Sequence, residues 1–100
     1  MRNGYKLFWS NRAVFDLQNI IEYLKNKWTD KEVRNFVKLL DKRLELIVVN
    51  PKLFPRTSRR RNLRRSVLSK HITIYYYVVD RAVRIVTLFD TRQDPKKLKL

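Results

Sequence analysis

Two stripes of apolar residues run through the first half of the chain at the spacing of α-helices. The first stripe begins three residues after Ser10, a candidate N-cap, and spans about four turns. Its members are Ala13, Leu17, Ile20, Ile21, Leu24 and Trp28. A short aromatic-rich segment at residues 5–9 precedes it. The pattern therefore predicts a strand followed by an amphipathic helix.

Residues 29–32 read Thr-Asp-Lys-Glu, which has the form of a capping box with Thr29 at the cap and Glu32 three residues later. They end the first helical region and open a second one. The second stripe consists of Val33, Phe36, Val37, Leu40, Leu44 and Ile47. Pro51 ends it, because proline disfavours helical backbone in the preceding residue, Asn50. We expect two antiparallel helices joined by a very short connection.

In the second half of the chain the apolar pattern changes to a period of two. Residues 51–62 form a candidate loop with two prolines and several arginines. Residues 63–70 alternate, and the segments 71–79 and 82–89 are rich in β-branched and aromatic residues. The element order is β-α-α-β-β-β. It predicts an α+β fold, in which a helical hairpin packs on one face of an antiparallel sheet.

Composition limits the chemistry that this fold can carry. The chain has 100 residues, so we expect residues 1–100 to form one domain. Because 44% of the residues are apolar and 12% are aromatic, the chain can bury a core. It has no cysteine and one histidine, which excludes disulfides, a thiolate nucleophile and a zinc site of cysteine and histidine. We expect no cofactor and no metal ion.

The chain shows no sign of a membrane or export segment. No stretch approaches the ~20 apolar residues that span a bilayer. The first ten residues lack both a continuous apolar run and a small-residue cleavage site. We therefore expect a cytoplasmic protein that does not bind membranes.

Charge is the strongest functional signal in the composition. The chain has 24 basic and 9 acidic residues, a net charge of +15. Residues 1–50 contribute 10 basic and 6 acidic residues (+4), and residues 51–100 contribute 14 and 3 (+11). The densest cluster is Arg56, Arg59, Arg60, Arg61, Arg64, Arg65 and Lys70. It predicts an anionic partner, such as nucleic acid or an acidic protein, although a solvated basic loop would have the same composition.

Within the strand at residues 71–79, alternation separates two sets of side chains. We expect Ile74, Tyr76 and Val78 to face the core. The opposite face would then carry His71, Thr73, Tyr75 and Tyr77, and its tyrosines could stack on bases. His71 could also serve as a general base or a phosphate contact, or be structural. We expect Trp9 and Trp28 to serve in packing, and Asp90 and Asp94 to pair with Arg92 or Lys96.

Several local motifs, in order, resemble those of the RelE/ParE superfamily of toxins from bacterial type II toxin–antitoxin modules. In the first helix, Ser10, Ala13, Asp16-Leu17, Ile20 and Tyr23-Leu24 follow the family pattern S-x-x-A-x-x-D-L-x-x-I-x-x-Y-L. Asn50-Pro51 with Phe54-Pro55 is similar to its N-P-x-x-F-P loop. Further similar segments are Leu63-Arg64-Arg65, Lys70-His71, Ile74-Tyr75-Tyr76 and residues 91–95, Thr-Arg-Gln-Asp-Pro. The resemblance covers nearly the whole chain.

The resemblance implies a growth-inhibiting toxin that is neutralised by a cognate antitoxin, whose acidic, amphipathic segment wraps over it. RelE-like members cut mRNA on the ribosome, and ParE-like members inhibit DNA gyrase instead. The resemblance thus implies the antitoxin and either ribosome-bound mRNA or gyrase as partners. The residues expected to bind the target or nucleic acid are Arg59, Arg60, Arg61, Arg64, Arg65, Lys70, Tyr75, Tyr77 and Arg92.

A metal-independent nuclease would need proton-transfer groups and cations for the phosphorane. Arg92 falls where RelE-like members have a phosphate-binding arginine, so the catalytic candidates are Arg92, His71 and Arg65, with Lys70 as an alternative cation. Ile72, however, occupies the place of a second family arginine, and the extra helix with a catalytic tyrosine has no match. These departures favour a ParE-like gyrase inhibitor. The alternatives are a RelE-like ribosome-dependent endoribonuclease and a non-catalytic nucleic-acid-binding module.

Overall fold

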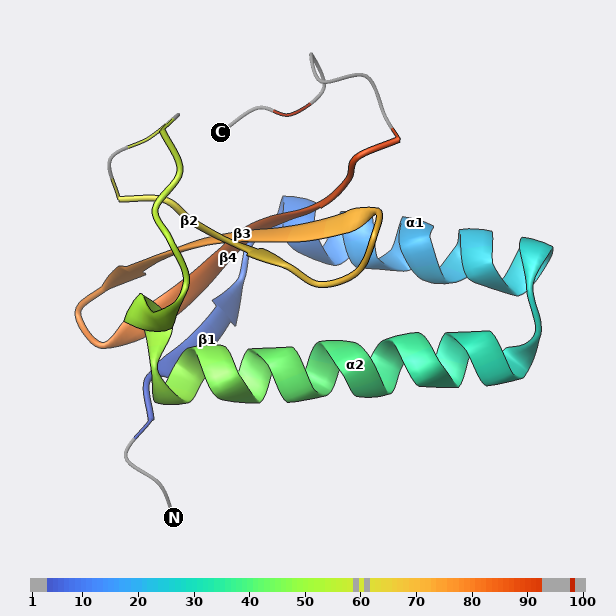
Figure 1. Cartoon of the computed structure of the whole chain (residues 1–100), viewed down its shortest axis with the longest axis horizontal. Coiled ribbons are helices and arrows are strands. Elements are labelled where there is room, and N and C mark those ends of the chain that lie inside the picture. Colours follow the sequence, from blue (N-terminus) through green and yellow to red (C-terminus); the bar gives the residue numbers. More distant parts are fainter. Residues whose placement is uncertain (1–3, 59, 61, 93–97, 99–100) are drawn as a thin grey trace.

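Four strands and two long helices make up the computed structural model, which describes residues 4–58, 60, 62–92 and 98 (Figure 1). The elements, in chain order, are β1 (Lys6–Trp9), α1 (Asn11–Lys27), α2 (Asp30–Val49), the short 3₁₀ helix η1 (Pro51–Leu53), β2 (Arg64–Val67), β3 (Ile72–Val79) and β4 (Ala82–Asp90). Their order confirms the predicted β-α-α-β-β-β arrangement. No helix among the described residues combines the length and the apolar character of a transmembrane span.

The sheet has the strand order β1-β4-β3-β2 and is mixed rather than wholly antiparallel. β2 pairs with β3, and β3 with β4, in antiparallel fashion, as expected. β1 instead runs parallel to β4, with Phe8 opposite Arg84. Between these two strands the chain passes through both helices and two further strands. The direction of this long-range pair therefore has no local signal in the apolar pattern.

A tight turn of two residues joins β3 and β4. Asp80 and Arg81 have φ angles of 51° and 61°, both in the left-handed region. Positive φ at both central residues is the mark of the type I′ turn, whose twist matches that of a hairpin. Aspartate tolerates this conformation better than most side chains, whereas arginine adopts it at some cost.

The core lies between the helices and one face of the sheet. Ile74 of β3 stands opposite Leu88 of β4, and Tyr76 stands opposite Ile85. All four side chains are buried, and they form one cluster with Ala13 of α1 and with Leu40, Leu44 and Ile47 of α2. Val78 packs against the same cluster. The prediction that Ile74, Tyr76 and Val78 face the core is confirmed.

Hydrogen bonds from the start of α1 fix a β-bulge in β4. Tyr75 stands opposite Thr87 and Tyr76 opposite Ile85, so Val86 is an extra residue in β4, as in a β-bulge. The Ser10 hydroxyl caps α1 by accepting a hydrogen bond from the backbone N–H of Ala13 and donates to the Val86 carbonyl at 2.7 Å. Two turns later, the Asp16 carboxylate accepts from the Thr87 hydroxyl and from the Leu88 N–H. Ser10 and Asp16, two residues of the first-helix motif, thus fix the bulge to the helix.

Candidate functional site

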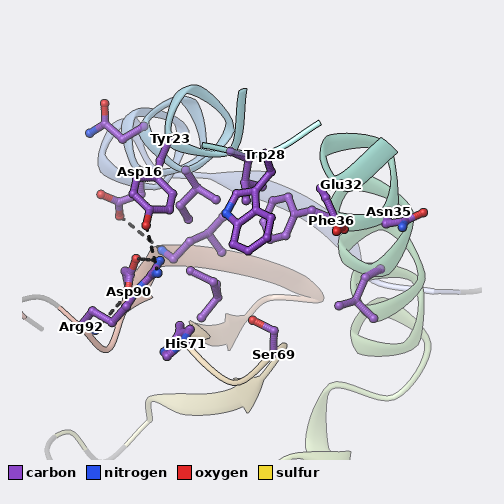
Figure 2. A pocket seen from close by; sticks show the side chains of 16 residues that line it. Asp16, Tyr23, Trp28, Glu32, Asn35, Phe36, Ser69, His71, Asp90 and Arg92 are labelled. Carbon is purple, nitrogen blue, oxygen red and sulfur yellow. Dashed lines mark hydrogen bonds and ion pairs between the residues drawn. The ribbon is translucent and has the colours of Figure 1, made fainter. Parts of the chain in front are cut away.

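A cleft of about 590 Å³ opens between the helical hairpin and the sheet, where β3 begins and β4 ends (Figure 2). Its lining comes from α1, α2 and the strand ends. The lining residues are Asp16, Asn19, Ile20, Tyr23, Leu24, Trp28, Glu32, Asn35, Phe36, Leu39, Ser69, His71, Ile72, Leu88, Asp90 and Arg92. The cleft therefore brings together the apolar stripes of both helices and the polar end of the sheet.

The helical wall of the cleft leaves large apolar side chains in contact with solvent. Trp28, at the tip of the hairpin, is 57% exposed, and Tyr23 and Leu39 are also exposed. The expectation that Trp28 serves in packing was wrong, because the hairpin extends past the sheet and none of the described elements covers its tip (Figure 1). Exposed apolar side chains that gather in one cleft mark a binding surface for another molecule.

Arg92 lies at the polar end of the cleft in a close ion pair with Asp90. The Arg92 Nη2 and Nε atoms lie 2.6 and 2.9 Å from the two carboxylate oxygens, and the Arg92 backbone N–H donates to Oδ1 at 2.9 Å. The guanidinium also lies 5.0 Å from the centre of the Tyr23 ring (Figure 2). The hydrogen bond from Arg92 is the main reason that the pKa of Asp90 lies below its usual range. The predicted pairing of Asp90 with Arg92 is confirmed.

His71 lines the same cleft from the side of the sheet (Figure 2). It precedes the first residue of β3, and its carbonyl accepts a hydrogen bond from the Thr91 N–H at 2.6 Å. The expectation that His71 shares a face with Tyr75 and Tyr77 was wrong, since strand alternation does not extend to a residue in the turn. Its charge is one of the minor influences that lower the pKa of Asp90.

The structure brings together only two of the three catalytic candidates. Arg92 and His71 both line the cleft. Arg65 stands opposite Tyr75 on β2, and the next residue, Ser66, is buried and accepts a hydrogen bond from Arg43 of α2. Because neighbouring strand residues point to opposite faces, Arg65 belongs to the face that the helices do not cover. We refer to this side of the sheet as the open face.

The predicted binding residues occupy different parts of the molecule. Arg64 is partly buried and donates to the Phe54 carbonyl at 2.7 Å, so it ties the loop after α2 to β2. Tyr75 and Tyr77 point to the open face, where the Arg60 guanidinium lies 5.9 Å from the centre of the Tyr77 ring. Lys70 is exposed in the turn before β3. The predicted residues Arg59 and Arg61, and also Asp94 and Lys96, lie outside the described residues.

Sequence reasoning missed two groups of residues in these surfaces. Trp28 belongs to the first apolar stripe, and helical periodicity does not distinguish a core position from the wall of an open cleft. Leu39 lies beside the second stripe, three residues after Phe36, and was not assigned to it. Phe8 and Arg84 stand opposite each other on β1 and β4, with the guanidinium 4.8 Å from the ring centre. Their alternation with Leu7 and Val83 could have placed them on the open face, but the β1–β4 pairing could not be foreseen. Among the described residues, no three His, Asp or Glu side chains gather as metal ligands would.

Comparisons with known proteins show that the fold occurs in solved structures. Solved structures with the same fold include the chromosomal ParDE toxin–antitoxin system of P. aeruginosa, at a TM-score of 0.74 and 15% identity over 89% of this chain and 98% of that one. The YoeB dimer of Staphylococcus aureus gives a TM-score of 0.60 at 19% identity, over 85% and 94%. The DinJ–YafQ toxin–antitoxin complex of E. coli gives 0.56 at 13%, over 89% and 94%. No curated protein matches the sequence.

A family model supplies the assignment that these distant structures cannot give alone. The model describes the ParE toxin of the type II toxin–antitoxin system parDE, and it matches residues 7–95, from β1 to beyond the Asp90–Arg92 pair. The match includes both helices of the cleft and, apart from the first residue of β1, every strand of the sheet. The chain therefore belongs to the ParE toxin family of type II toxin–antitoxin systems.

Proposed function

We propose that this toxin arrests growth by inhibiting DNA gyrase, that it does not cut RNA, and that an antitoxin segment neutralises it by occupying the cleft. The observation that carries the choice of target is the ion pair between Asp90 and Arg92. A nuclease needs a guanidinium that can bind the scissile phosphate. Here the Asp90 carboxylate already takes the donors of Nε and Nη2, and its negative charge repels a phosphate.

Two further features of the chain support this choice. Ile72 is buried where a RelE-like nuclease would place a second arginine, so a cation that could share the phosphate charge is missing there. Arg65, the other basic candidate, lies on the open face and not in the cleft. The remaining proton-transfer candidate, His71, therefore has one guanidinium beside it, and that guanidinium is neutralised by Asp90.

The cleft suits an amphipathic segment of the antitoxin. Its apolar wall, with Trp28, Leu39 and Phe36, would bury the apolar face of a helix, as in other helix-in-groove complexes. Lys27 and Lys31 are exposed on either side of the hairpin tip. Acidic residues of the bound segment would pair with these lysines, which matches the net charge of +15 on the toxin.

Induced expression of the toxin tests the target directly. We expect growth arrest together with loss of gyrase supercoiling activity, while primer extension shows intact mRNA. Cleaved mRNA with normal supercoiling would contradict the proposal. Normal growth with both readouts unchanged would leave only the non-catalytic nucleic-acid-binding module.

A second experiment tests the place of the antitoxin. The probe is the product of the adjacent open reading frame, which we expect to be a small acidic protein. Trp28→Ser should weaken the binding of this protein to the toxin at least about tenfold, because a tryptophan that becomes buried in an interface is a typical binding hot spot. Phe15→Ser is the matched control, since Phe15 is 61% exposed on α1 but does not line the cleft. Equal losses in the two variants would place the antitoxin elsewhere.

One observation favours the RelE-like alternative. His71 and Arg92 line one cleft, as a proton-transfer group and a cation of a nuclease would. Under this alternative, Arg92→Gln abolishes mRNA cleavage while the antitoxin still binds. Under our proposal, the wild-type toxin does not cleave mRNA, so the mRNA stays intact with either protein.

A further inference from the structure

The open face carries a second, smaller depression that has no part in the cleft. It has a volume of about 290 Å³ and lies beside the bulge in β4. Its lining consists of Phe8, Trp9, Ser10, Arg60, Tyr77, Arg84, Ile85 and Val86. None of these residues lines the cleft, so the two cavities can be occupied independently.

The main feature of this depression is a row of side chains that crosses three strands. Phe8 of β1 stands opposite Arg84 of β4, and Arg84 stands opposite Tyr77 of β3. The Arg84 guanidinium lies 4.8 Å from the centre of the Phe8 ring, and the Arg60 guanidinium lies 5.9 Å from the centre of the Tyr77 ring. Adjacent strands lie about 4.8 Å apart. Aromatic rings and guanidinium groups therefore alternate across the sheet at short spacing.

Arg84 supplies the positive charge at the centre of this row. Stacking on Phe8 orients the Arg84 guanidinium without neutralising it. On the described strands, the charged side chains that register and alternation assign to this face are Lys6, Arg65 and Arg84, and none of the other residues there is Asp or Glu. The carboxylates of the ion pairs Arg12–Asp16 and Arg92–Asp90 both line the cleft.

The lining demands a ligand that is planar as well as anionic. A carboxylate side chain of an acidic peptide would satisfy the guanidinium groups but would bring no aromatic ring to stack beside Phe8 and Tyr77. A nucleotide supplies both groups at once, because its base stacks on rings and guanidinium planes and its phosphate accepts hydrogen bonds from arginine. Beyond Tyr77, the opposed pair of Tyr75 and Arg65 repeats the combination of ring and cation.

We propose that the open face binds a single strand of nucleic acid, with one base in the depression against Phe8 and Tyr77 and its phosphate on Arg84. The strand continues across the sheet toward Tyr75 and Arg65, where the next ring and cation lie. Since the depression and the cleft share no lining residue, an antitoxin segment in the cleft leaves this site accessible. The site depends neither on gyrase nor on the antitoxin.

Fluorescence anisotropy with labelled oligothymidylate and oligouridylate tests the proposal on the full chain. Arg84→Gln should weaken binding about tenfold and reduce the slope of log Kd against log salt by about one, because one phosphate contact is lost. Phe8→Leu should weaken binding about tenfold as well, because it removes a stacking ring, but it should leave the salt slope unchanged, because the charge of Arg84 is retained. Arg34→Gln is the charge-matched control, since Arg34 is exposed on α2. It should change the affinity less than twofold.

Several outcomes would overturn the proposal. Equal effects of Arg84→Gln and Arg34→Gln would show that only net charge matters. Equal competition by polyglutamate would assign the face to acidic peptides, and equally tight binding of duplex DNA would exclude recognition of unstacked bases. Circular dichroism checks that Phe8→Leu folds, and Tyr77→Leu gives an independent test of stacking if it does not. Trp28→Ser, which alters only the cleft, should leave nucleic-acid binding intact even if the proposed antitoxin site is wrong.

Discussion

The substitution Asp90→Asn tests whether Asp90 keeps phosphate away from Arg92. In the wild-type protein the carboxylate holds Arg92 through bonds of 2.6 and 2.9 Å. Asparagine has nearly the same shape but no charge, so no neighbouring carboxylate would offset the positive charge of the guanidinium. We expect the fold to tolerate the change, because the Arg92 side chain is 44% exposed and such pairs contribute at most about 1 kcal/mol.

The size of the effect follows from the distance between the charges. A phosphate bound to the remaining face of Arg92 would lie about 5 Å from the Asp90 carboxylate, where the repulsion is roughly 1–3 kcal/mol at effective dielectric constants of 20–80. Screening by physiological salt favours the lower part of this range. Asp90→Asn should therefore tighten phosphate binding by about five- to thirtyfold.

His71 provides the assay, since it is the only histidine of the chain and lines the cleft beside Asp90. Titration with inorganic phosphate at pH 8, followed through the proton resonances of its ring, gives the dissociation constant for the cleft. Asp41→Asn is the matched control, because Asp41 is exposed on α2 and does not line the cleft. An equal gain in the control, or no gain in Asp90→Asn, would refute the role given to Asp90.

Two further predictions concern stability. The Tyr76 hydroxyl donates to the Pro51 carbonyl. Burial raises the pKa of this hydroxyl to about 12, against 10 in the unfolded chain. As pH rises, Tyr76 therefore loses its proton in the unfolded state first. Stability should fall between pH 10 and pH 12 by up to roughly 2–3 kcal/mol, and urea unfolding of Tyr76→Phe should lack this part of the loss. Asp16→Asn and Thr87→Val should each cost about 1–3 kcal/mol, since the first replaces the charged acceptor of the bond that holds the β4 bulge with a neutral amide, and the second removes its donor. Their effects should be less than additive in a double-mutant cycle, and full additivity would contradict the pairing.

The helices and the core could be predicted because their signals are local. Ser10 and Thr29 cap the two helices where the sequence indicates, and each side chain accepts from the backbone N–H three residues later. Ile74 and Tyr76 face the core because alternation within one strand determines the face. The extra residue in β4, Val86, has no such signal, since a bulge depends on contacts with α1 that are distant in sequence.

The candidate site was less predictable than the fold. The pairing of Asp90 with Arg92 was foreseen, because the two residues are close in sequence and opposite in charge. The position of Trp28 was not, since periodicity gives the face of a helix and not whether another element covers it. Whether Arg65 lies on the same side of the sheet as His71 and Arg92 also depends on where each strand begins. His71 directly precedes β3, so its side chain does not follow the alternation of the strand.

The central claim is that this ParE family toxin acts on gyrase and not on RNA. A supercoiling assay with purified gyrase and relaxed plasmid measures it most directly, with ribosomes and mRNA incubated in parallel with the same toxin. Our account predicts that the toxin stops supercoiling while the mRNA stays intact. Full supercoiling in the presence of toxin, together with mRNA cleavage that depends on Arg92, would contradict it.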